Sequence, residues 1–201
     1  ESGINVYLST LTASRVLSLD ALASLPGWTS LIVAEGSRLR LTDITSSAGA
    51  GMLLQGRHTA AGIAVQLDGG ELGSIKETNI SVDGGFLHID GSTANPTNSA
   101  GNVGVWLTGK AAAPGGLLIN ATGATEVTLT AFNGGTGGPA LLASSMSFIG
   151  PQATAAATFN IEAKGGRINS PVQISGSTFS SAGALTLVSD GLSVLNSRLV
   201  G

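Results

Sequence analysis

Short runs in which apolar and polar residues alternate recur along the chain, and glycine-rich breaks separate them. Alternation with a period of two places the apolar side chains on one face of a β-strand and the polar ones on the other. Strands this short, at intervals of roughly ten residues, are typical of a β-sandwich, a β-barrel or a β-solenoid. The clearest runs are at residues 4–8, 39–41, 65–67, 87–89, 127–129, 159–161, 185–187 and 192–194.

One segment, from Ser18 to Leu25, has a different pattern. Leucine occurs at every third position there, at Leu19, Leu22 and Leu25. This spacing, followed by Pro26-Gly27, predicts a short helix that ends at the proline. The alternative is an irregular loop that leads into an apolar run at residues 31–33.

Two internal repeats distinguish between the possible β architectures. A motif of apolar, any, apolar, polar and glycine residues recurs at residues 52–56, 65–69, 87–91, 105–109 and 172–176. In addition, residues 172–174 align with residues 192–194, and residues 177–179 with residues 197–199, at a shift of 20. So many copies of one strand-and-turn unit are unusual in a sandwich, whose strands differ from one another. The pattern indicates a degenerate repeat of about 20 residues.

A repeat of this length predicts a right-handed parallel β-helix, a β-solenoid with roughly 20 residues and two or three short strands per coil. Equivalent strands of successive coils would stack about 4.8 Å apart. Their inward side chains would form apolar ladders, and glycine would serve the corners. The alternative is an ordinary sandwich or jelly roll. The expected inward residues are Val65, Leu67, Leu87, Ile89, Val105, Leu107, Val172, Ile174, Leu185, Leu187, Leu192 and Val194.

We expect residues 1–201 to form a single β-helix segment of a larger protein, with residues 1–48 as an atypical or capping part. Four segments rich in small residues and proline interrupt the strand pattern, and we interpret them as enlarged corners. They are residues 92–102, 110–116, 133–139 and 151–157.

The composition narrows the functional classes. Charged residues make up 10% of the chain, hydrophobic residues 42%, and the net charge is −3. Disordered chains have low hydrophobicity and high charge, so this composition excludes disorder. A nucleic-acid-binding protein needs an excess of basic residues, so the negative net charge argues against that class as well. The absence of cysteine excludes disulfides, thiolate metal sites and thiol catalysis. No phosphate-binding or dinucleotide-binding motif is present, so no cofactor is expected.

Trp106, His58 and His88 are the candidate binding residues. Trp106 alternates with two apolar neighbours, which predicts that its indole points outward, where aromatic side chains anchor sugars and proteins. The alternative is that the corner at residues 92–102 covers it. His88 also alternates with apolar residues and is expected at a solvated outer face. The two histidines lack the spacing of a metal site, so we expect no bound metal.

Several carboxylates raise the question of catalysis. Asp68, Glu71, Asp83 and Asp90 fall close together in sequence, and paired carboxylates cleave glycosidic bonds. Asp68 and Asp90 occupy the same position of the repeated motif and are the pair most able to face each other. However, three of these acids precede a glycine, and Asp-Gly is a turn pair. We therefore assign no catalytic residue.

The sequence from residue 176 onward, GSTFSSAGALTLVSDGLSVLNSRL, resembles the repeats of filamentous-haemagglutinin-like exoproteins. Residues 62–69 and 104–109, the latter reading GVWLTG, resemble the Gly-Val-x-Leu-x-Gly units of the same family. These proteins are adhesins that Gram-negative bacteria export by two-partner secretion, and autotransporter passengers are related in pattern. The resemblance implies a right-handed β-helix, passage through an outer-membrane transporter and a place outside the cell or on its surface. It also implies a role in adhesion and virulence.

These observations together predict a non-catalytic adhesin or structural rod that presents a binding surface at the bacterial cell exterior. Its partner would be a cell-surface glycan or protein of a host or of another bacterium, with no nucleic acid and no insertion of this segment into a membrane. The alternative is a β-helix enzyme that degrades polysaccharide, including the phage tailspike type. Placement of charge separates the two hypotheses, because an enzyme gathers its acids and bases in one groove.

Overall fold

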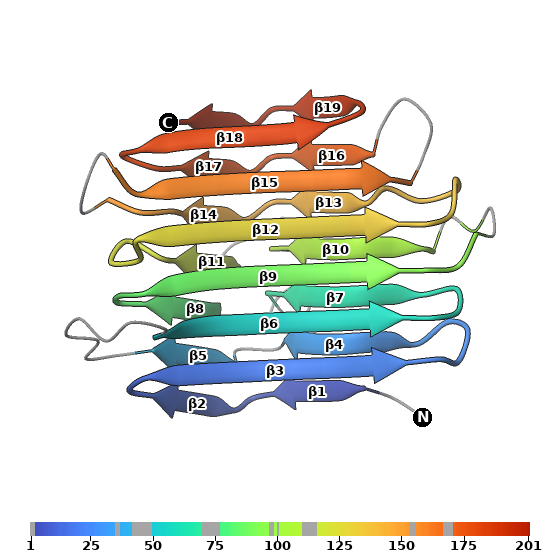
Figure 1. Ribbon diagram of the computed structural model, residues 1–201, viewed down its shortest axis with the longest axis horizontal. Helices are drawn as coiled ribbons and strands as arrows, with labels where there is room; N and C mark the ends of the chain where they lie inside the picture. The colour runs from blue at the N-terminus through green and yellow to red at the C-terminus, as the bar shows by residue number, and fades with distance from the viewer. Residues whose placement is uncertain are drawn as a thin grey trace.

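The computed structural model describes residues 3–34, 37–41, 50–69, 77–96, 99, 101–109, 116–152, 156–166 and 171–201. These residues form twenty β-strands, and the described part of the chain contains no helix. The strands belong to three sheets in which every neighbouring pair is parallel. Successive strands along the chain belong to different sheets, so that each sheet gains one strand per coil. Figure 1 shows the coils stacked from the N-terminal strands to the C-terminal ones.

Each sheet takes every third strand of the chain. Sheet A consists of β1 (Ile4–Tyr7), β4 (Thr29–Ala34), β7 (Ile63–Asp68), β10 (Val103–Thr108), β13 (Leu141–Ser144), β16 (Val172–Ser175) and β19 (Leu192–Leu195). Sheet B consists of β2 (Thr10–Ala13), β5 (Arg38–Leu41), β8 (Thr78–Val82), β11 (Leu117–Asn120), β14 (Ser147–Ile149), β17 (Thr178–Ser180) and β20 (Arg198–Val200). Sheet C, which has the longest strands, consists of β3 (Val16–Ala23), β6 (Gly51–His58), β9 (Phe86–Thr93), β12 (Glu126–Asn133), β15 (Thr158–Gly165) and β18 (Ala184–Ser189).

This arrangement confirms the expected parallel β-solenoid and excludes the sandwich. The repeat of 20 residues is confirmed for the last two coils. There the backbone N–H of Ser177 donates a hydrogen bond to the hydroxyl of Ser197, which is 20 residues further along the chain. Earlier coils contain more residues. Thr93 and Asn133, for example, lie on adjacent strands of sheet C but are 40 residues apart in sequence. Longer connections between the strands account for the difference, because the strands themselves stay between three and eight residues long.

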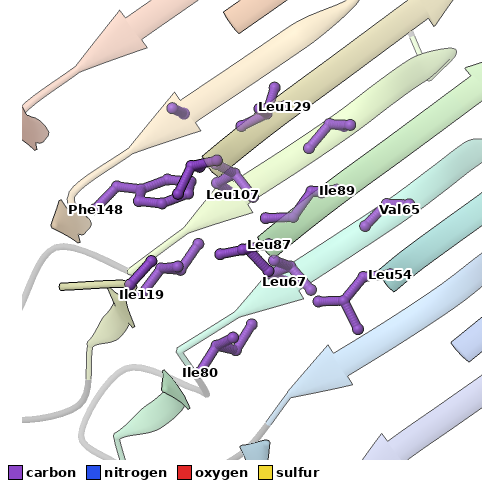
Figure 2. Packing of buried hydrophobic residues seen from close by; sticks show 14 of the residues in the cluster. Leu54, Val65, Leu67, Ile80, Leu87, Ile89, Leu107, Ile119, Leu129 and Phe148 are labelled. Atoms are coloured by element: carbon purple, nitrogen blue, oxygen red, sulfur yellow. The ribbon is translucent and has the colours of Figure 1, made fainter. Parts of the chain in front are cut away.

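Apolar ladders from the three sheets meet in one continuous core (Figure 2). Eight of the twelve residues expected inside, from Val65 to Ile174, are no more than 1% exposed. Leu185 and Leu187 are partly buried against the same core. Leu192 and Val194 pair with inward residues of β16 but are 48% and 41% exposed, since among the described residues no coil covers them on their other side.

Three phenylalanines fill the core near the C-terminal coils. Phe148, Phe159 and Phe179 are fully buried, and their ring centroids are 4.6 to 6.3 Å apart. These separations are typical of favourable aromatic pairs. The rings come from β14, β15 and β17, so they connect sheets B and C across the interior.

The prediction of a short helix or a loop at residues 18–25 is wrong. Residues up to Ala23 belong to β3, which pairs with β6 residue by residue from Val16 to Ala23. The three-residue leucine spacing reflects no helical face. Leu19 packs against the core, Leu22 is 60% exposed on the outer face, and Leu25 lies in the corner that follows. Pairing with the next coil decides the local structure here, as tertiary context commonly does for short segments.

Two of the four expected enlarged corners lie largely within the described residues and connect strands. The segment 92–102 connects β9 to β10 and 133–139 connects β12 to β13, although the first two residues of the former and Asn133 are still in strands. Most of the segment 110–116 and part of 151–157 lie outside the described residues.

Buried hydrogen bonds hold the corner between sheets C and A. Asn133 is 1% exposed, and its Nδ2 donates to the carbonyl oxygens of Asn102, Gly138 and Pro139 at 2.8 to 3.2 Å. Its Oδ1 accepts hydrogen bonds from the Thr93 hydroxyl and the backbone N–H of residue 135. One side chain thus satisfies polar groups of two successive coils, which a buried corner requires.

Candidate binding surface

The three outer faces of the solenoid have different chemistry. Within its strands, sheet C carries four carboxylates and two basic side chains. The strands of sheet B carry three arginines and no carboxylate. Sheet A carries a single charged residue, Asp68, together with amides, aliphatic residues and Trp106. Each face is therefore a distinct candidate site.

Trp106 lies on the outer face of sheet A, as expected. Its neighbours Val105 and Leu107 are fully buried, and the indole is partly buried on the opposite face. In register, Trp106 lies between Gln66 of β7 and Leu142 of β13. This places an aromatic ring between an amide and an aliphatic side chain, all three partly exposed.

The Gln66 amide beside Trp106 is held at both of its ends. Its Nε2 donates to Oδ2 of Asp68 at 3.3 Å, and its Oε1 accepts from the Thr29 hydroxyl at 3.5 Å. A ring beside an oriented and partly exposed amide can stack on the face of a sugar while the amide binds the sugar hydroxyls.

His88 lies on the outer face of sheet C, also as expected, and it is paired. Its Nε2 is 3.2 Å from Oε1 of Glu126 on the next strand, and its ring lies 4.4 Å from the ring of Phe86. The hydroxyl of Thr128 donates to the same carboxylate oxygen at 3.3 Å. The sequence could not reveal this partner, since Glu126 is 38 residues further along the chain.

The other carboxylates of sheet C are paired as well. Arg57 donates two hydrogen bonds, at 3.0 and 3.1 Å, to Asp20. The amide of Gln55 donates to Asp90 at 2.7 Å.

Glu162 pairs with Lys164 on its own strand. The hydrogen bond and the charge of Glu162 raise the pKa of the Lys164 ammonium. With this pair, each of the four strand carboxylates of sheet C has a partner that satisfies it, which is what a stable charged outer face requires.

Asp68 and Asp90 do not face each other. Asp68 ends β7 in sheet A and is 6% exposed, whereas Asp90 lies in the middle of β9 in sheet C. The turn interpretation is correct for Asp83, which follows β8, but wrong for Asp90, whose Asp-Gly pair lies inside a strand. At Gly91 a Cβ atom would lie 2.2 Å from the carbonyl oxygen of residue 104, so close packing against sheet A explains this glycine. Glu71 lies outside the described residues.

His58 is buried at the end of β6 and is 1% exposed. Its Nδ1 lies 2.9 Å from the carbonyl oxygen of Ala60, and its Nε2 has no hydrogen-bond partner among the described residues. It is stacked in register on Thr93, in the same corner as Asn133. In this position its imidazole does not reach a ligand at the surface.

A pocket on the outer face of sheet B was not predicted from the sequence. It has a volume of about 290 Å³ and is lined by Arg38, Leu39, Arg40, Glu77, Asn79 and Ser81. The signal was present in the run Arg38-Leu39-Arg40-Leu41, because buried leucines at alternate positions place both arginines outward.

Within the described ranges no group of three or more histidines, aspartates or glutamates is placed to hold a metal ion. The same part of the chain has no helix long and apolar enough to cross a membrane. Comparisons with models of protein families, with curated proteins and with solved structures found no match to this chain.

Proposed function

We propose that this protein is a non-catalytic adhesive rod that binds a glycan or protein through the outer face of sheet A around Trp106. The observation that carries the proposal is the outward, partly exposed indole between Gln66 and Leu142. Tryptophan is enriched at the centres of binding interfaces, so an outward indole beside Leu142 is a candidate anchor for a partner. The solenoid beneath it supplies a rigid support.

The proposal includes the location of the protein in the cell and the handedness of its β-solenoid. Resemblance of the repeats to filamentous-haemagglutinin-like exoproteins supports export through an outer-membrane transporter to the exterior of a Gram-negative bacterium. We propose a right-handed winding, because connections between parallel strands of one sheet are right-handed in nearly all proteins. The chain lacks cysteine, so stability outside the cell rests on its continuous core rather than on disulfides.

A binding screen on arrayed glycans and on whole cells tests this function. We expect Trp106→Ala to abolish the strongest signal and Trp106→Phe to retain part of it, because the phenyl ring still stacks. Gln173→Ala is the control, since Gln173 lies two strands away in the same outward column. Binding that survives Trp106→Ala unchanged would contradict the proposal.

The second candidate function is polysaccharide cleavage on sheet C, and one observation favours it. Acids and bases do gather there, and Glu126 lies beside His88 at 3.2 Å. Against this, three of the four strand carboxylates of the face are engaged in pairs that span neighbouring strands. Cleavage of a glycosidic bond needs two carboxyl groups that flank the sugar, about 5 to 9.5 Å apart. The ladder of pairs therefore supports a structural role for these charges.

A further inference from the structure

We propose a second binding site, the pocket on the outer face of sheet B, which takes a carboxylate-bearing sugar through Arg38 and Arg40. This site is separate from Trp106, and its existence does not depend on the function proposed above. Its six lining residues come from β5, from β8 and from the residue just before β8. The volume of about 290 Å³ lies just below the usual range for small-molecule pockets, which suits a single sugar ring.

The two arginines are arranged to hold one anionic group. They alternate with buried leucines on β5, so their side chains leave the sheet on the same side, roughly 7 Å apart at their bases. Among the described residues, no carboxylate lies within ion-pair distance of Arg38. Arg40 has only a long contact of 3.7 Å with Asp83, and both of those side chains are about half exposed. Their guanidinium groups thus remain able to bind a carboxylate in a bidentate manner.

The neighbouring strand adds neutral polar groups at the right positions. Asn79 and Ser81 of β8 pair in register with Arg38 and Arg40, and both point outward and are partly exposed. An amide and a hydroxyl beside two guanidinium groups are suited to bind sugar hydroxyl groups, which both donate and accept hydrogen bonds. The pocket therefore combines two arginines, which can bind one anionic group, with an amide and a hydroxyl that also donate to the carboxylates of Glu77 and Asp83.

Charges around the pocket favour a sparsely charged ligand. Glu77 lines the same pocket, Asp83 contacts Arg40, and the whole chain has a net charge of −3. A nucleic acid or a densely sulfated polymer would bring further anionic groups toward these carboxylates, which costs binding free energy. A uronic acid has one carboxylate per ring and several hydroxyls, and a Glu77 carboxylate can accept hydrogen bonds from those hydroxyls.

Affinity electrophoresis and calorimetry with defined polysaccharides test the site. The probes are polygalacturonate, its methyl ester, heparin and neutral dextran. We expect binding to polygalacturonate that exceeds binding to heparin, and none to the methyl ester or to dextran. The Arg38→Ala/Arg40→Ala double variant should lose about tenfold or more in affinity, as expected when charge-assisted hydrogen bonds are removed. Arg38→Lys should lose part of the affinity, because an ammonium group keeps the charge but cannot form the bidentate hydrogen bonds of a guanidinium group.

Arg198→Ala is the matched control, because Arg198 is an exposed arginine of sheet B on the last strand, β20. It removes the same charge far from the pocket and should leave the affinity unchanged. The proposal is overturned by absence of polygalacturonate binding, by an equal loss in Arg198→Ala, or by tighter binding to heparin. Trp106→Ala separates the two sites: it should leave polygalacturonate binding intact whether or not the function proposed for Trp106 holds.

Discussion

Ile174 and Val194 occupy the same inward position of the adjacent strands β16 and β19, yet their environments differ sharply. Ile174 lies between two coils and is 1% exposed, whereas Val194 lies on the last coil and is 41% exposed. In a solenoid an inward-pointing side chain is fully buried only when a coil packs against it on both sides. The stability of each coil is therefore coupled mainly to the coils next to it.

A carboxylate at these positions should reveal that dependence. Ile174→Asp should lower the free energy of unfolding by several kcal/mol, about 4, because an unpartnered charge enters an apolar ladder. In a protein that consists of residues 1–201, Val194→Asp should cost far less, because the Val194 side chain is 41% exposed there. Gln173→Asp, on the outer face, should be close to neutral. Urea unfolding followed by circular dichroism measures all three, and equal losses for Ile174→Asp and Gln173→Asp would show the inward phase to be wrong.

Asn133 should be the most sensitive polar residue of the described corners. Asn133→Ala leaves the carbonyl oxygens of Asn102, Gly138 and Pro139 without their donor. We expect a loss of about 2 to 4 kcal/mol in the free energy of unfolding, because buried polar groups lose their partners. Asn160→Ala is the control on the exposed outer face of sheet C, where the change should be within about 0.5 kcal/mol. Comparable losses in the two variants would refute a special role for Asn133.

Leu8 has a backbone φ of 47°, a left-handed conformation that a leucine rarely adopts. The equivalent turn residues after β16 and β19 are Gly176 and Asn196, which suit positive φ. Because Leu8 is 58% exposed, Leu8→Asn relieves strain with little loss of packing and should stabilise the protein by about 0.5 to 1 kcal/mol. Leu25→Asn, at an exposed leucine outside the left-handed region, should bring no gain. Calorimetric melting distinguishes the two, and a lower melting temperature for Leu8→Asn would contradict the strain.

Lys164 should titrate above its ordinary pKa of 10.5 because of Glu162. A raised pKa in the folded state means that the pair stabilises the protein below pH 10.5, and that this contribution disappears as the pH rises through the folded-state pKa. Glu162→Gln should return the pKa of Lys164 toward its ordinary value, as measured by NMR of the lysine side-chain carbons. An unchanged titration in that variant would show that Glu162 is not the cause.

Much of the fold could be predicted from local pattern, because inward and outward phase are properties of single strands. The alternation at residues 65–67 and 172–174 indicated which side chains lie inside, and the shift of 20 aligned the last two coils. Residues 18–23 were misassigned because three-residue leucine spacing imitates a helix when inward and outward leucines happen to follow one another. Asp90-Gly91 was misassigned because a glycine needed for close packing has the same signature as a turn glycine.

The candidate sites depend on contacts between coils. The sequence therefore indicated which side chains point outward, but not which side chains lie beside them. It indicated that Trp106 and His88 point outward, but not that Gln66 and Glu126 lie beside them. The distance in sequence between partner strands varies with the corner insertions, from 20 residues to 41. Without those lengths, no periodicity could have placed Arg38 beside Asn79.

Release of reducing ends from a bound polysaccharide distinguishes a rod that binds sugar without cutting it from an enzyme. The protein is incubated with each polysaccharide that it retains, and new reducing ends are measured over time against a protein-free sample. We predict retention of the polymer and no new reducing ends, with the same result for Glu126→Gln. A steady increase in reducing ends that disappears in Glu126→Gln would show instead that the protein is an enzyme and that the charged face of sheet C is catalytic.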